Sequence, residues 1–181
     1  MLLLVANPRG SAPLINFVND LKKSGLYVLG HVQKGDFDAL DSDPNDNYVH
    51  WLNVVDHLKV KAFINLTVAR TVREGMHHLI RISGLGAMRP NCVAIGFHDD
   101  QEPVDFFVNK ESERFRDSFH LRSTEDRLSM EEWIDMIKDV MRMNKNTIVV
   151  KNMNNFDKAT VSRYVLVTYN ILLMCSFTMK I

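Results

Sequence analysis

Five short runs of mostly apolar residues recur along this chain of 181 residues, separated by segments with a helical repeat. The runs span residues 2–6, 26–32, 60–66, 91–97 and 147–150. A strand with one face in water would alternate apolar and polar side chains, whereas these runs are apolar throughout, as expected of strands covered on both faces. The pattern therefore predicts an α/β fold: an open, mostly parallel five-stranded sheet with helices on both faces.

Capping residues and apolar spacing predict four helices. The first is expected to have Ser11 as its N-cap and Pro13 in its first turn, and to end at Gly25. Ser129 and Glu132 form a capping box that opens the last helix. The three helices after the first are predicted over residues 47–58, 68–83 and 129–144. The side chains expected to face the core are Leu14, Phe17, Val18, Leu21, Trp51, Leu52, Val55, Leu58, Val68, Val72, Met76, Leu79, Ile80, Trp133, Ile134, Ile137, Val140 and Met141.

Two segments lack a clear period. Residues 99–128 carry charges, serines and scattered phenylalanines, which predicts a mobile loop. Beyond Lys151 the pattern degrades, so one domain is expected over residues 1–151 and an atypical tail over residues 152–181. The apolar run at residues 164–177 is shorter than the roughly 20 residues that a membrane span needs, so we expect no membrane-spanning helix.

Charge and cysteine content narrow the classes of function. The 22 Lys and Arg residues balance the 22 Asp and Glu residues, and the sequence shows no basic stripe of the kind that binds nucleic-acid phosphates. Nucleic acid is therefore not an expected partner. Cys92 and Cys175 match no metal or redox spacing, which indicates free thiols in a reducing compartment.

One candidate binding segment, Asn7-Pro8-Arg9-Gly10-Ser11, follows the first apolar run. It leads into a helix N-terminus, where backbone N–H groups bind anions in open parallel sheets. It lacks the lysine and second glycine of a P-loop and the three glycines of a dinucleotide fingerprint. Two interpretations stay open for Asn7, Arg9, Gly10 and Ser11: contact with a phosphate or an adenine nucleotide such as ATP or ADP, and a simple turn.

Other polar clusters give little support to a catalytic or metal site. The aspartates at residues 36–46 fail the calcium-loop pattern, because Asp46 stands where glycine is needed and Leu52 where glutamate is needed. The seven histidines include no set with zinc-ligand spacing. His98 and Asp99 follow the fourth run and leave a hydrolase as a formal alternative, but no nucleophile motif accompanies them. We therefore expect no metal, no resident cofactor and no enzyme activity.

A candidate phosphorylation site lies in the predicted loop. Ser123 and Thr124 precede two acidic residues and stand close to Arg122 and Arg127. A phosphate there would add about two negative charges and would order the loop through the arginines. Short motifs of this kind also arise by chance, so both interpretations stay open.

The turn Gly84-Leu85-Gly86-Ala87-Met88-Arg89-Pro90-Asn91 leads a set of motifs that resembles one known family. The set resembles the cytosolic C-terminal domain of the cation-chloride cotransporters, solute carrier family 12, over about residues 2–150. Residues 26–32, 82–86 and 143–146 most resemble the branch called cotransporter-interacting protein. The further motifs are Gly30-His31-Val32, Trp51-Leu52, Val60-Lys61-Ala62-Phe63, Val93, Gly96 and Phe97, and the turn is marked by Gly84, Gly86, Met88, Pro90 and Asn91.

The resemblance implies an open α/β sheet similar to that of universal stress proteins. The glycines of the universal-stress nucleotide motif are missing, since His98 and Asp99 stand after the fourth run. In complete family members, membrane helices precede this domain and a second α/β half follows it. The chain departs from that pattern by lacking the helices and by its sequence after Lys151, so it resembles a fragment that does not transport ions itself.

The function implied by the resemblance is regulation and dimerisation of a chloride-coupled potassium or sodium symporter. The parent protein would lie in a membrane, with this domain on the cytosolic side. Its helix faces would bind a second copy or another cotransporter subunit. The alternative from the residues themselves is a small-ligand module that senses adenine nucleotide through Asn7 to Ser11.

Overall fold

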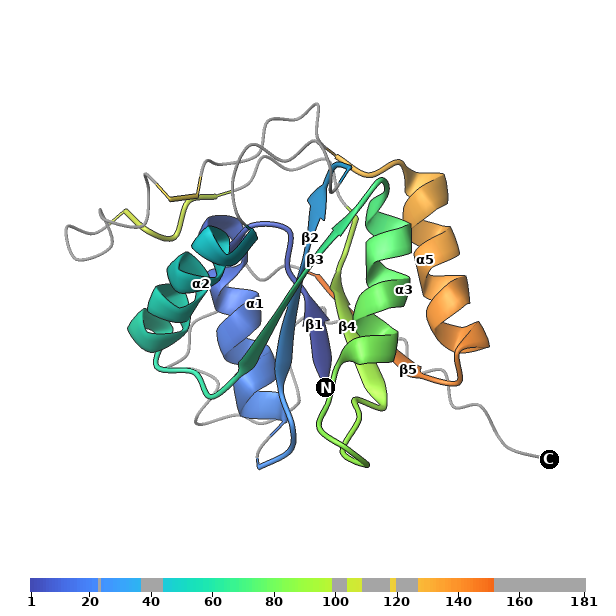
Figure 1. Ribbon diagram of the computed structural model, residues 1–181, viewed down its shortest axis with the longest axis horizontal. Coiled ribbons are helices and arrows are strands. Elements are labelled where there is room, and N and C mark those ends of the chain that lie inside the picture. The colour runs from blue at the N-terminus through green and yellow to red at the C-terminus, as the bar shows by residue number, and fades with distance from the viewer. Residues whose placement is uncertain (23, 37–43, 99–103, 109–117, 120–126, 152–181) are drawn as a thin grey trace.

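A five-stranded sheet runs through the centre of the computed structural model, with strand order β3-β2-β1-β4-β5 and every pair of neighbours parallel (Figure 1). The structure describes residues 1–22, 24–36, 44–98, 104–108, 118–119 and 127–151, with the backbone alone for 44–46. The parallel α/β sheet predicted from the apolar runs is confirmed. The strands are β1 (Leu2–Leu4), β2 (Val28–Lys34), β3 (Phe63–Ala69), β4 (Cys92–Gly96) and β5 (Asn146–Val150).

Helices cover both faces of this sheet, as the sequence predicted (Figure 1). On one face lie α1 (Pro8–Leu21) and α2 (Pro44–Leu58), and on the other lie α3 (Val72–Ile82) and α5 (Met130–Arg142). The strand order is compatible with the expected likeness to universal stress proteins. Within the described part of the chain, no helix is both long and apolar enough to span a bilayer.

The two faces are built by alternate residues of each strand. Leu3 packs in a cluster with α1 and α2, whereas its neighbour Leu2 packs in a cluster with α3 and α5. Both side chains are fully buried. Leu3 pairs in register with Leu29 of β2 and with Ala94 of β4. Because both faces of the sheet are covered, the central strands β1 and β4 need apolar residues at every position, which is why their runs lack alternation.

The start of α1 differs from the prediction. The N-cap is Asn7, whose Oδ1 accepts a hydrogen bond from the Arg9 backbone N–H at 2.9 Å, and Ser11 lies inside the helix. Pro8 takes the first helical position, where a missing N–H costs least. Pro13 therefore lies within the helix instead of in its first turn.

Other boundaries also move. β2 and β3 begin later than the predicted residues 26 and 60, at Val28 and Phe63. Val68, expected in the third helix, belongs to β3, where it pairs with Gln33. The helix α3 begins after Thr71, whose side chain accepts a hydrogen bond from the Glu74 backbone N–H. A β-branched valine favours a strand, and the threonine supplies the cap, so the boundary falls between them.

Some predicted core positions face outward. Leu52 is 41% exposed and Leu21 is 42% exposed, while Ile134 and Met141 are each 39% exposed. The reason is that each helix buries a narrower stripe than the apolar pattern indicated. The residues that take the inward positions in α2 and α5 are Trp51, Val54, Val55, Met136, Asp139 and Val140. The predicted cap of α5 is confirmed, because Ser129 Oγ accepts a hydrogen bond from the Glu132 backbone N–H at 3.1 Å.

Candidate functional site

The order of the strands reverses beside β1. The chain moves outward from β1 through β2 to β3, then crosses to β4 on the other side of β1 and continues to β5. The carboxyl ends of β1 and β4 therefore flank the position where open α/β sheets bind ligands. The predicted segment Asn7 to Ser11 follows β1 here, and His98 follows β4.

Arg9, in the first turn of α1, makes contacts with residues far along the chain. Its Nε donates to Asp105 Oδ1 at 3.3 Å, and its Nη2 donates to the other carboxylate oxygen. Its Nη1 donates to the Phe119 carbonyl at 2.8 Å. The arginine and aspartate side chains are only 12% and 18% exposed. This forked contact thus joins α1 to two parts of the segment between β4 and α5.

We call residues 104–108 and 118–119 the strap. Phe107 is buried against Ala12 of α1 and Val54 of α2. Its ring makes a T-shaped contact with that of His57, with ring centroids 5.8 Å apart. Phe119 meets Trp51 edge to face, with ring centroids 5.5 Å apart. Mobility of residues 99–128 stays a prediction, but the strap itself is attached to α1 and α2 through two aromatic side chains.

Pro13 explains where the strap joins α1. A proline has no N–H, so the carbonyl four residues earlier, that of Arg9, loses its helical donor. The Phe106 backbone N–H donates to that carbonyl at 3.0 Å. The interior proline thus creates an acceptor on α1, and the strap satisfies it.

The contacts of Arg9 bear on the predicted anion site. Its guanidinium faces the Asp105 carboxylate, and Asp105 Oδ1 also accepts from the Phe107 backbone N–H at 2.9 Å. A phosphate at Asn7 to Ser11 would compete with this carboxylate for the same donors. Binding of a nucleotide here stays a prediction that must include displacement of Asp105.

The hydrolase alternative gains no catalytic arrangement from the described residues. His98 Nε2 lies 2.8 Å from the Leu128 carbonyl, and its ring packs against that of Trp133. Asp99 lies outside the described residues, as do Ser123 and Thr124 of the candidate phosphorylation site. In the parts of the chain that the structure describes, no three His, Cys, Asp or Glu side chains gather as metal ligands.

The predicted family turn is a tight hairpin between α3 and β4. Leu85 and Met88 exchange two backbone hydrogen bonds, at 3.0 and 2.9 Å. Gly84 has φ 120°, and a Cβ on it would lie 2.4 Å from the Met88 carbonyl oxygen, so glycine is required there. The Asn91 carbonyl accepts from the Asn146 backbone N–H at 2.9 Å, which ties the end of the turn to β5. Pro90 is buried beside it.

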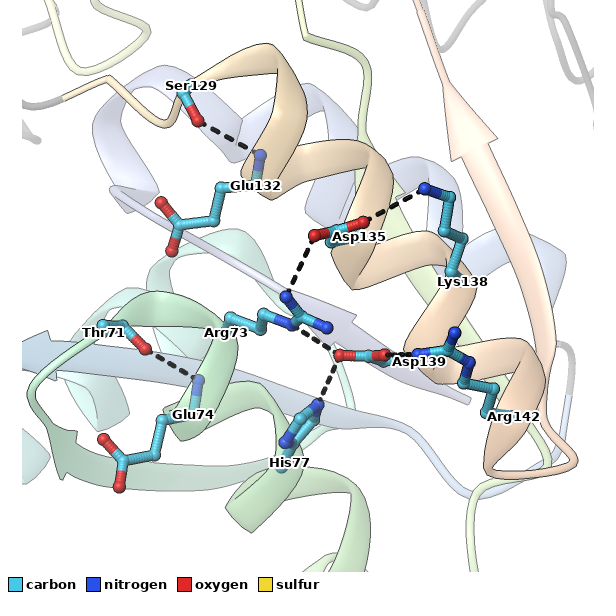
Figure 2. A network of polar contacts seen from close by, with 10 residues as sticks. All are labelled: Thr71, Arg73, Glu74, His77, Ser129, Glu132, Asp135, Lys138, Asp139 and Arg142. Carbon is cyan, nitrogen blue, oxygen red and sulfur yellow. Dashed lines mark hydrogen bonds and ion pairs between the residues drawn. The ribbon is translucent and has the colours of Figure 1, made fainter.

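A network of charged side chains joins α3 to α5 (Figure 2). Arg73 on α3 donates to Asp139 through Nε and to Asp135 through Nη1, at 2.5 and 3.0 Å. Asp139 also contacts His77 Nε2 at 2.9 Å and Arg142 at 3.3 Å. The hydrogen bond from Arg73, followed by that from His77, lowers the pKa of Asp139 to about 2, against the effect of burial. The network fixes the position of α5 on α3.

Sequence reasoning missed Asp105, Phe107, Phe119 and the pair of Arg73 with Asp139. One signal for the pair was available: Asp139 falls on the same helical face as Met136 and Val140, and a carboxylate on a buried face needs a partner. For the strap, Pro13 was expected in the first turn of the helix, where no carbonyl loses its donor, so the unpaired Arg9 carbonyl and its donor were not predicted.

Comparison with known proteins gives a consistent result. The family model described as Solute carrier family 12 matches residues 11–168. Solute carrier family 12 member 9 of Xenopus laevis is 44% identical over 172 residues, covering 84% of this chain and 19% of the relative. The human member 9 is 42% identical over 168 residues, covering 83% and 18%. Vacuolar cation-chloride cotransporter 1 of Saccharomyces cerevisiae is 26% identical over 181 residues, covering 87% and 16%.

Two features of these matches matter for the function. The chain spans less than a fifth of the length of each of these relatives. The matched range extends beyond Lys151, into the part of the chain that the sequence pattern left as an atypical tail.

Proposed function

Because this chain belongs to the solute carrier 12 family, we propose that it is a regulatory and assembly domain of a cation-chloride cotransporter-like membrane protein. The observation that carries the proposal is the family match over residues 11–168, which coincides with an α/β domain in which no described helix could span a bilayer. The domain would lie on the cytosolic side of the membrane. The parent protein would carry chloride together with potassium or sodium, and this chain would not carry ions itself.

The proposed action is mechanical. The domain would bind a second copy or another cotransporter subunit and bias the attached transporter towards one of its conformations. The rigid connection of α3 to α5 through Arg73 and Asp139 supports this role, because a force applied to one helix is passed to the other. The exposed apolar side chains Tyr48, Val49 and Leu52 on α2 supply a surface for a partner subunit.

Light scattering of the 181-residue chain during gel filtration tests the assembly role. We expect a dimer whose fraction increases with concentration, and we expect Val49→Asp to shift it to monomer by placing a charge in the contact. Lys34→Asp, a charge change on an exposed residue of β2, is the matched control and should leave the dimer intact. A strict monomer at high concentration, with no binding to the corresponding domain of member 9, would contradict the proposal.

The regulatory role is tested in a chimera. In member 9 of Xenopus laevis, the matching region is replaced by this chain, and chloride-dependent rubidium uptake is compared with that of a deletion. We expect the chimera to assemble and to respond like the parent relative, and the deletion to fail. A chimera that reaches the membrane but behaves like the deletion would exclude a regulatory function.

Adenine-nucleotide sensing remains the second candidate, favoured by the position of α1 at the reversal of strand order. The ion pair of Arg9 with Asp105 weakens it, since a ligand must break that pair. Thermal unfolding with ATP, ADP and AMP separates the two functions. Stabilisation that increases in Asp105→Asn would support nucleotide binding, and no stabilisation at millimolar ligand in either protein would exclude it.

Phosphorylation of Ser123 or Thr124 is the proposed switch for the regulatory role. Both residues belong to the segment between the strap and α5. Added phosphate would bring negative charge close in sequence to Arg127, with which it could pair. Mass spectrometry of the chain from cells, followed by the dimer assay on Ser123→Asp and Ser123→Ala, tests the idea; equal dimer formation in both variants would count against it.

A further inference from the structure

The connections that lead from helices into strands all lie at one edge of the sheet, because the strands are parallel. These connections are residues 22–27, 59–62, 83–91 and 143–145, seen along the lower side of Figure 1. Their sequences contain no Asp or Glu. They contain the basic residues Lys22, Lys23, Lys59, Lys61, Arg89 and Lys145. We call this side of the molecule the basic edge.

The basic edge also carries exposed apolar side chains. Ile82 is 61% exposed, and Leu85 and Met88 are each 63% exposed, all within the α3–β4 connection or the residue before it. The two exchanged hydrogen bonds between Leu85 and Met88 keep the hairpin tight, so the two side chains are presented on a rigid support. Phe63, at the start of β3, adds a further apolar side chain that is 54% exposed.

Basic residues surround this apolar hairpin. Arg81 precedes it, Arg89 belongs to it, and both are exposed. No acidic residue occurs between Glu74 and Asp99 in the sequence. Lys145 lies near the end of the hairpin, because the backbone N–H of the next residue, Asn146, donates a hydrogen bond to the Asn91 carbonyl. The hairpin is thus an apolar tip among cations, the combination by which proteins attach to an anionic lipid surface.

Charges in helix ends alone do not account for the basic edge. Cations near helix C-termini offset the helix dipole. The dipole does not exclude acids, however, because Asp20 and Asp56 lie in the last turns of α1 and α2. However, the dipole gives no reason for exposed apolar side chains at the same place. Cations are also crowded here: Lys22 Nζ donates to the Lys61 carbonyl, and burial followed by the charge of Lys61 lowers the pKa of Lys22.

The opposite edge of the sheet carries acidic residues together with basic ones such as Arg70. The first turns of α3 and α5 carry Glu74, Glu131 and Glu132, and Asp36 follows β2. The two edges therefore differ: the connections of the basic edge contain no acidic residue, whereas acids and bases occur together at the opposite edge. Such a difference would orient the domain at a negatively charged surface, with the basic edge towards it.

We propose that the basic edge binds an anionic lipid bilayer, with Leu85 and Met88 inserted among the headgroups and Arg81, Arg89 and Lys145 on the lipid phosphates. β1 also begins at this edge, so residues that precede Leu2 in a longer parent protein would join the sheet on the membrane side. The inference goes beyond the proposed assembly role, because the chain could form a dimer without binding lipid, and it could bind lipid without forming a dimer.

Flotation with vesicles tests the proposal on the 181-residue chain. We expect binding to vesicles of phosphatidylcholine with phosphatidylserine, no binding to phosphatidylcholine alone, and loss of binding as salt is raised. Arg81→Gln and Arg89→Gln should each weaken binding about fivefold. Arg70→Gln removes an exposed arginine at the opposite edge and is the matched control, expected to leave binding unchanged.

Apolar insertion has its own control pair. Leu85→Gln with Met88→Gln should abolish vesicle binding, whereas Val49→Gln, on the outer face of α2, should not. The added tryptophan of Met88→Trp should shift its emission to the blue on anionic vesicles, and that of Val49→Trp should keep its emission. Circular dichroism shows whether each variant is folded.

Three results would overturn the inference. These are no flotation of the wild-type chain with anionic vesicles, equal flotation after both arginine substitutions, and an equal loss in Arg70→Gln. Binding to nucleic acid that Leu85→Gln leaves unchanged, with no vesicle binding, would identify the edge as a polyanion surface instead. Normal vesicle binding by a strictly monomeric chain would separate this inference from the assembly role.

Discussion

Asp139 is a buried carboxylate whose ionised form holds two helices together. Its pKa is lowered from 3.8 to about 2, mainly by the hydrogen bond from Arg73. A folded pKa below the unfolded value means that the carboxylate stabilises the fold above 3.8, and that this contribution is lost as the pH falls towards 2. We predict that Asp139→Asn lowers the free energy of unfolding at neutral pH by roughly 1–3 kcal/mol.

Urea unfolding at neutral pH and near pH 2 measures this effect, with the unfolding free energy of the wild type as reference. The difference between Asp139→Asn and the wild type should shrink across this range and be mostly lost at its acid end. Asp20→Asn, an exposed acid on α1, is the control and should change stability by less than about 0.5 kcal/mol. A difference that is independent of pH would show that the network acts through packing alone.

Gly84 and Gly86 make a matched pair in one hairpin. Both have positive φ, at 120° and 55°, but only at Gly84 would a Cβ meet another atom, 2.4 Å from the Met88 carbonyl oxygen. We predict that Gly84→Ala costs at least about 2 kcal/mol, because strain and a backbone clash add. Gly86→Ala should cost about 1 kcal/mol, from its left-handed backbone alone. Thermal unfolding of both variants tests this, and equal losses would contradict the role given to Gly84.

Residues that act through distant partners were the ones that sequence could not place. The glycine turn at Gly84 was predictable, because its constraint is local. The partner of Arg9 was not, since Asp105 lies 96 positions away and its own neighbourhood showed no period. Asp139 was an intermediate case. Its position on the buried face of a helix could be predicted from the sequence, but its partner could not, because Arg73 stands 66 positions earlier.

At the scale of elements, the strap is the part whose attachment depends on few contacts. Arg9 holds both of its parts, and Phe107 fills the space between α1 and α2. We predict that Arg9→Gln releases the strap while the sheet stays folded, because the strands contribute to neither contact. Hydrogen exchange of Phe106 and Phe107 amides should become faster, corresponding to a loss of roughly 1–3 kcal/mol in local opening.

The control for the strap is Arg70→Gln, which removes an ion pair with Asp36 whose side chains are 79% and 56% exposed. It should leave exchange in the strap unchanged, since exposed pairs contribute little. Exchange at Leu29 in β2 serves as the internal reference in both variants. Faster exchange at Leu29 in Arg9→Gln would mean that the strap is part of the global fold rather than a separate unit.

Helices and strands could be predicted as elements, whereas their limits depended on contacts across the fold. Strands of a parallel sheet that is covered on both faces are apolar throughout, so the number of strands followed from the sequence, whereas their order in the sheet was not predicted. The limits of β3 did not follow from the sequence either, because its register is set by pairing with β2, from Val28 with Phe63 to Lys34 with Ala69. The start of α1 also moved, since Asn7 is as good a cap as Ser11 and the pattern did not separate them.

At the scale of the whole molecule, the distribution of charge over the surface could not be predicted from the sequence. Equal numbers of acids and bases indicated no preference for an anionic partner. The basic edge is assembled from four connections, and each is separated from the next by about 20 to 60 residues of sequence. They lie at the same edge only because the strands are parallel. No single stretch of the chain is basic enough to reveal it.

One shared sheet under two helical layers predicts cooperative unfolding of the domain. Trp51 lies in the layer of α1 and α2, and Trp133 packs with the layer of α5 and donates to the Gly96 carbonyl at 3.1 Å. In single-tryptophan variants, Trp51→Phe and Trp133→Phe, we expect both layers to unfold at one urea midpoint. Leu29→Ala, whose cavity opens on the Trp51 side, should lower the unfolding free energy by about 2–5 kcal/mol and move both signals equally. Val49→Ala, at an exposed position on α2, is the control and should move neither signal appreciably. Two separate midpoints, with Leu29→Ala moving only the signal of Trp51, would show that the layers are independent, and a force on α3 could not then reach α1 through the sheet.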